Sequence, residues 1–166
     1  TKLAEIAKAQ GADVILYMTS PETQNEDPVA EPYNVASADR DTAVGRRMKK
    51  ALQPKAVIPV PLAIKNIQTG DADKPGTDLV FRYHNDGHPN QTCAFLVANL
   101  FYAAVTGKSP EGLTFNSVTE NKLKNGKDPD GGEPTVVFDN KEKTYLQRMA
   151  YEAVLEFNGK TKASKR

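Results

Sequence analysis

Residues 90–107, which read NQTCAFLVANLFYAAVTG, decide the fold. Asn90 is a residue type that caps helix N-termini, and Gly107 is the type that most often ends a helix in the left-handed conformation. Between them, apolar side chains occur on almost every side of a helix, which is typical of a helix buried in a core. The apolar run 93–105 is shorter than the ~20 residues that a membrane-spanning helix needs. We therefore predict a buried helix over 91–106 and no membrane span.

Short apolar runs alternate with helical patterns along the chain. Residues 14–17, within a strand expected over 13–18, and residues 56–60 are continuous apolar runs, which favour strands buried on both faces of a parallel sheet. Helical spacing and caps predict further helices over 2–10, 37–53, 61–67 and 140–157, with Val44, Met48 and Leu52 on one face of the second. Asp139 and Glu142 form a capping box for the last helix. Its apolar face is expected to consist of Tyr145, Leu146, Met149, Ala153 and Phe157. This alternation predicts an α/β fold, a three-layer α/β/α arrangement with a mostly parallel sheet.

The number of strands indicates an incomplete domain. With the segment 78–83, about three strand candidates occur, where a sheet usually has five or six. Residues 108–134 are expected to be rich in loop, with 125–133 the most mobile part. We interpret residues 1–159 as the carboxyl-terminal portion of a single domain and residues 160–166 as a basic tail.

Composition excludes several classes of partner. The 166 residues are 39% hydrophobic and 26% charged, which fits one ordinary folded domain. The net charge of +1 provides no field that would select nucleic acid.

The basic tail is expected to be a solvated terminus, with phosphate binding as the alternative. The single cysteine, Cys93, excludes an internal disulfide, and its apolar surroundings predict a buried, unreactive thiol.

The loop before the buried helix carries the chemistry. Residues 83–90 read YHNDGHPN and place the carboxylate of Asp86 two residues before the imidazole of His88. Such a pair forms the base half of a hydrolytic triad, in which the acid orients the imidazole and the imidazole takes a proton. A following helix N-terminus favours the neutral imidazole, whereas the Asp86 carboxylate favours its charged form. The alternative is a simple Asp86-Gly87 turn with His88 as a surface residue on it.

Metal binding and a local nucleophile are both disfavoured. His84, Asp86 and His88 are residue types that bind zinc or iron, but three ligands on so short a loop rarely converge, so we expect no metal and no cofactor. None of the serines lies in a Gly-x-Ser-x-Gly elbow; they are Ser20, Ser37, Ser109, Ser117 and Ser164. Ser20 is followed by Pro21 and lacks the surroundings of an oxyanion hole.

Residues 80–113 resemble the carboxyl-terminal catalytic block of SGNH (GDSL-type) hydrolases. The likeness is most specific in Asp86-Gly87-His88-Pro89-Asn90 and continues through the buried helix to 106–113, TGKSPEGL. It most resembles a bacterial branch of the family and can be followed more loosely in residues 14–20 and in the last helix. The resemblance implies a three-layer α/β/α fold and hydrolysis of esters, often acyl groups on carbohydrate or lipid.

The resemblance also implies roles for individual residues. The general base of the family corresponds to His88. The acid usually lies three residues before this histidine, where the chain has Asn85; we therefore favour Asp86 as the orienting acid, with Asn85 as the alternative at that position. The family's serine and oxyanion donors correspond to segments before Thr1, so the implied partners are an ester substrate and the missing N-terminal part of the protein. Family habit implies a periplasmic or extracellular location.

A non-catalytic function is the alternative. Asn85 at the acid position and the missing serine are also compatible with a degenerate hydrolase domain that binds carbohydrate or a partner protein.

Overall fold

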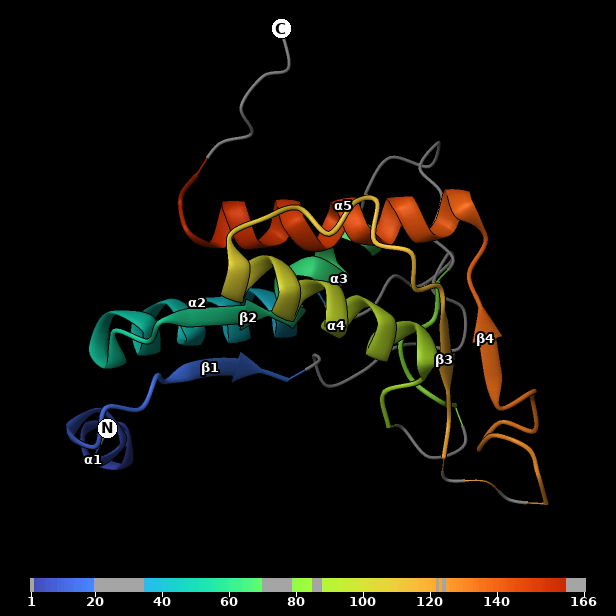
Figure 1. Ribbon diagram of the computed structural model, residues 1–166, viewed down its shortest axis with the longest axis horizontal. Helices are drawn as coiled ribbons and strands as arrows, with labels where there is room; N and C mark the ends of the chain where they lie inside the picture. Colours follow the sequence, from blue (N-terminus) through green and yellow to red (C-terminus); the bar gives the residue numbers. More distant parts are fainter. Residues whose placement is uncertain are drawn as a thin grey trace, which may run out of the picture.

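The chain has a mixed α/β fold in a computed structural model that describes residues 2–19, 35–69, 79–84, 88–121, 123 and 125–160 (Figure 1). The predicted α/β class is therefore confirmed. In chain order the elements are α1 (Lys2–Ala9), β1 (Ile15–Met18), α2 (Val35–Leu52), β2 (Ala56–Pro59), α3 (Val60–Gln68), α4 (Gln91–Thr106), β3 (Ser117–Thr119), β4 (Thr135–Val137) and α5 (Asn140–Phe157).

Two small sheets are present in the described part of the chain. β1 and β2 form a parallel pair, in which Leu16 lies opposite Val57, whereas β3 and β4 form an antiparallel hairpin. The third strand candidate contributes only an isolated bridge between Arg82 and Pro89. The three-residue strand β3 lies within the segment expected to be loop-rich and was not predicted, because so short a strand shows no alternating pattern.

Helices contact both faces of the parallel pair. The ring of Tyr17 stacks on Phe101 of α4, with centroids 5.7 Å apart, whereas the adjacent Met18 contacts α2 at Gly45. Successive side chains of a strand point to opposite faces, so α4 and α2 cover opposite faces. A Cβ atom at residue 45 would overlap the Met18 side chain, so the glycine permits this close approach.

Two predictions of which residues are buried were wrong. α2 buries Ser37, Ala38, Thr42 and Gly45, whereas the predicted inward residues Val44 and Met48 are exposed. Small side chains are favoured there because α2 lies so close to β1. β1 is not buried on both faces, since Ile15 and Tyr17 are 41% and 45% exposed; among the described strands it pairs only with β2, which is buried throughout.

The helix α4 has the predicted bounds and lies at the centre of the main core. Among the described elements, α4 makes its most extensive contact with α5, beside which it lies in Figure 1. Phe95 is fully buried, and its ring lies 4.9 Å from Phe115 and 4.4 Å from Phe138 between centroids. Val105, near the carboxyl end, is 46% exposed, so the helix is buried along most of its length rather than all of it.

The last helix confirms its predicted cap and apolar face. The Asp139 carboxylate accepts a hydrogen bond of 2.8 Å from the Glu142 N–H, and the predicted inward residues are buried, namely Tyr145, Leu146, Met149, Ala153 and Phe157. No helix among the described residues is both long and apolar enough to cross a membrane.

We predict that Phe95→Ala lowers the free energy of unfolding by about 3–5 kcal/mol, because it leaves a cavity between two other aromatic rings. Val105→Ala, on the exposed end of the same helix, is the matched control and should cost less than about 1 kcal/mol. Urea denaturation followed by circular dichroism measures both. Equal losses in the two variants would contradict the central position of Phe95.

Candidate functional site

Main-chain hydrogen bonds hold the two sides of the histidine loop together. The Tyr83 N–H donates to the His88 carbonyl at 2.8 Å, and the Asn90 N–H donates to the Phe81 carbonyl at 3.2 Å. Arg82 and Pro89 form the bridge between these two pairs. The backbone of His88 is therefore fixed at the end of a short antiparallel ladder.

The Asn90 side chain connects this ladder to the buried helix. Its Oδ1 accepts from the Cys93 N–H at 3.1 Å, which caps α4, and its Nδ2 donates to the Val80 carbonyl at 2.9 Å. The predicted cap is confirmed. His88 is exposed and lies two residues before this cap.

Of the other loop residues singled out from the sequence, the structure describes only His84. His84 is exposed on the opposite side of the loop from His88. Asp86 and Asn85 lie outside the described residues, so the predicted pairing of an acid with His88 stays a prediction. Within the described ranges, which omit Asp86, no group of three His, Cys, Asp or Glu side chains is arranged to hold a metal ion.

A buried phenol beneath the loop was missed by the sequence analysis. Tyr83 is 4% exposed, and its Oη lies 2.8 Å from Gln91 Oε1 and 3.1 Å from Glu120 Oε2. Gln91 Nε2 donates to the Pro134 carbonyl at 3.1 Å, which fixes the amide with its oxygen toward the phenol. A phenol carries one proton and donates to only one acceptor at a time. Because both acceptors lie within hydrogen-bond distance, Tyr83 connects the histidine loop with α4 through Gln91 and with the β3–β4 hairpin through Glu120.

The turn of this hairpin reaches the histidine loop directly. The carboxylate of Asp130 accepts a hydrogen bond of 3.0 Å from the His84 N–H. Asp128 shapes the turn, because its Oδ1 accepts from the N–H groups of Asp130 at 3.0 Å and Gly132 at 2.7 Å. The sequence predicts a mobile loop here, because no local pattern indicates a partner 46 residues away.

The three serines that the structure describes all lie outside the histidine loop. Ser37 is buried in α2, where its Oγ accepts from Arg40 Nη2 at 3.3 Å. Ser109 lies beyond the carboxyl end of α4, about 25 Å along the helix from the cap near His88. Ser117 is an exposed residue of β3. Ser20 and Ser164 lie outside the described residues.

The thiol of Cys93 is buried, as predicted. The residue is 1% exposed, and burial raises the pKa of the thiol to about 12, against a smaller lowering effect of the Arg82 charge. At neutral pH it is therefore a neutral thiol and a poor nucleophile.

Comparison of the chain with models of known families, with curated proteins and with solved structures found no match.

We predict that Tyr83→Phe lowers the free energy of unfolding by about 1–3 kcal/mol, because the buried Gln91 oxygen loses its phenol partner. Tyr102→Phe removes the same group from α4 about three turns further along and should change stability little. Chemical denaturation measures both variants. A neutral Tyr83→Phe would show that the phenol contributes nothing to the loop.

We also predict that Cys93 reacts with Ellman's reagent at pH 8 only after unfolding. The raised pKa keeps the thiol protonated in the folded state, and burial excludes the reagent. Labelling rates with and without denaturant provide the measurement. Rapid labelling of the folded protein would place the thiol at the surface.

Proposed function

We propose that the chain is the carboxyl-terminal portion of an SGNH-type ester hydrolase in which His88 is the general base. The observation that carries the proposal is an exposed imidazole on a loop whose backbone is fixed on both sides, directly before the capped N-terminus of a buried helix. A catalytic base needs both access to substrate and a fixed position.

The arrangement around the parallel strands also supports the proposal. α2 and α4 contact opposite faces of the β1–β2 pair, as a three-layer α/β/α fold requires. In Figure 1, α4 begins at the end of the pair toward which β1 points. Ligand sites of open α/β sheets occur at this carboxyl end of the strands.

The proposed reaction is acyl transfer to a serine, followed by hydrolysis. His88 takes the proton of the serine hydroxyl while the serine oxygen attacks the ester carbonyl carbon, and it then gives the proton to the departing alcohol. A water molecule, deprotonated by the same imidazole, next attacks the acyl-serine carbonyl; the acid product leaves and the imidazole returns the proton to the serine oxygen. The proposal assigns the serine and the oxyanion donors to a part of the protein outside this sequence, and the orienting acid to Asp86.

His88 rather than His84 is proposed as the base for two reasons. The resemblance to the hydrolase family places the base directly before a proline and the helix cap, as His88 is. His84 instead precedes the tip of the loop, where its N–H is bonded to Asp130. Because both imidazoles are exposed, His84 provides a matched control.

We predict that His88→Ala lowers hydrolysis of p-nitrophenyl acetate by roughly 10⁴-fold or more in the longest form of the protein that its gene encodes. His84→Ala should retain most of the activity. Asp86→Asn should lose activity while Asn85→Ala retains it, because only a carboxylate stabilises the imidazolium.

Two results would overturn the proposal. Equal rates for the wild type and His88→Ala would favour the non-catalytic alternative of a binding domain. Equal losses in His84→Ala and His88→Ala would indicate a general effect on the loop rather than a base at residue 88.

A further inference from the structure

The turn of the β3–β4 hairpin presents a carboxylate to the backbone beside His88. The Asp130 side chain accepts a hydrogen bond of 3.0 Å from the His84 N–H. The N–H of the preceding residue, Tyr83, donates to the His88 carbonyl at 2.8 Å. Two successive main-chain N–H groups therefore connect the hairpin turn with the proposed base.

A second contact joins the hairpin to the same segment. Glu120 directly follows β3, and its Oε2 lies 3.1 Å from the hydroxyl oxygen of Tyr83. The Glu120 N–H donates to the Pro134 carbonyl at 2.7 Å, which keeps Glu120 in the hairpin. The hairpin thus contacts Tyr83 at its side chain and His84 at its main chain. Both contacts use carboxylates, which form stronger hydrogen bonds than neutral acceptors.

The hairpin is itself held in place. Val118 and Val136, one on each strand, pack against the main core, and both strands contact α4. In the turn, the Asp128 carboxylate accepts from two main-chain N–H groups, and Lys127 pairs with Glu133. The position of the turn is therefore fixed relative to the helix that follows the histidine loop.

The position of His88 is sensitive to this arrangement. Its side chain is exposed, so core packing does not fix the residue, whereas its carbonyl is held by Tyr83. A general base must lie within hydrogen-bond reach of the proton that it takes. A displacement of about 1 Å, even by a change far from the chemistry, can lower a rate about 10²-fold.

We propose that Asp130 is a positioning residue for His88. Its carboxylate fixes residues 83–84 from the hairpin, and Tyr83 in turn holds the backbone of the base, so Asp130 acts without contacting substrate. The catalytic part of this inference rests on the proposed function, whereas the coupling between the hairpin and the loop does not.

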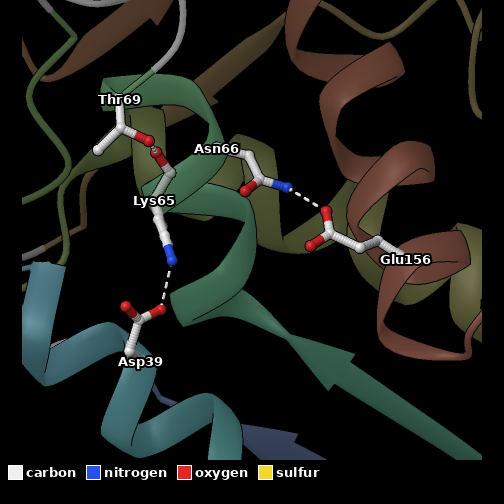
Figure 2. Close-up of polar contacts among 5 residues, drawn as sticks. All are labelled: Asp39, Lys65, Asn66, Thr69 and Glu156. Atoms are coloured by element: carbon white, nitrogen blue, oxygen red, sulfur yellow. Dashed lines mark hydrogen bonds and ion pairs between the residues drawn. The ribbon is translucent and has the colours of Figure 1, made fainter.

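Four variants test the hydrogen bond. Asp130→Ala removes the acceptor, whereas Asp130→Asn keeps an oxygen that accepts from the His84 N–H. Glu133→Ala removes a carboxylate that pairs within the same hairpin. Glu156→Ala breaks a bond of 2.7 Å from Asn66 Nδ2, which joins α5 to α3 rather than to the loop (Figure 2). The last two variants are the matched controls.

The first test measures hydrogen exchange of the Tyr83 amide by NMR, relative to the amide of Ala150 in the buried face of α5. Asp130→Ala should raise the relative exchange rate about three- to tenfold, the effect of one hydrogen bond. Asp130→Asn and both controls should leave it unchanged. An unchanged rate in Asp130→Ala, or an equal increase in Glu133→Ala, would overturn the proposal.

The second test measures hydrolysis of p-nitrophenyl acetate by the longest form of the protein that its gene encodes. Asp130→Ala should lower kcat about 10- to 100-fold, because the base is displaced. Its KM and melting temperature should change no more than those of Glu156→Ala. Asp130→Asn should recover most of kcat, because the acceptor is restored.

The outcomes separate this inference from the proposed function. An inactive wild type would overturn the proposed function and the catalytic role of Asp130 together. An active wild type whose kcat is not lowered by Asp130→Ala would overturn the role of Asp130 alone. A kcat that Asp130→Asn fails to restore would show that the charge, rather than the hydrogen bond, is responsible and would also overturn it.

Discussion

The cap at the start of α4 is the interaction on which the rest of the site depends. One side chain, Asn90, satisfies the first turn of the helix and also holds the incoming segment at Val80. The same helix carries Phe95 into the aromatic cluster and Phe101 onto the face of β1. The histidine loop is thereby fixed relative to the core, although its imidazoles are exposed.

Contacts from distant parts of the chain complete this region. The β3–β4 hairpin provides Glu120 to the buried phenol of Tyr83 and Asp130 to the backbone of the loop. Two carboxylates thus contact the loop from a segment more than 30 residues away in the sequence. Their partners are the phenol of Tyr83 and the backbone N–H of His84, so the hairpin contacts the loop through hydrogen bonds.

The sequence predicted the elements that local chemistry determines, and missed those that tertiary contacts determine. The bounds of α4 followed from Asn90 and Gly107, and the start of α5 followed from Asp139. The inward face of α2 was mispredicted because the close approach of Met18 selects small residues instead of the apolar stripe. Glu120 and Asp130 lie in short, polar segments whose pattern carries no information about a partner, so their contacts with the histidine loop could not be predicted.

The junction between β2 and α3 has a consequence for how this fold can change. β2 ends at Pro59 and α3 begins at Val60, so no connecting residues separate the strand from the helix. Every residue of the strand and the first residues of the helix are buried. An insertion there would displace core side chains, whereas the exposed turn near Asp130 can lengthen without such disturbance. Added residues are therefore tolerated by the core at the hairpin turn and not at the end of β2.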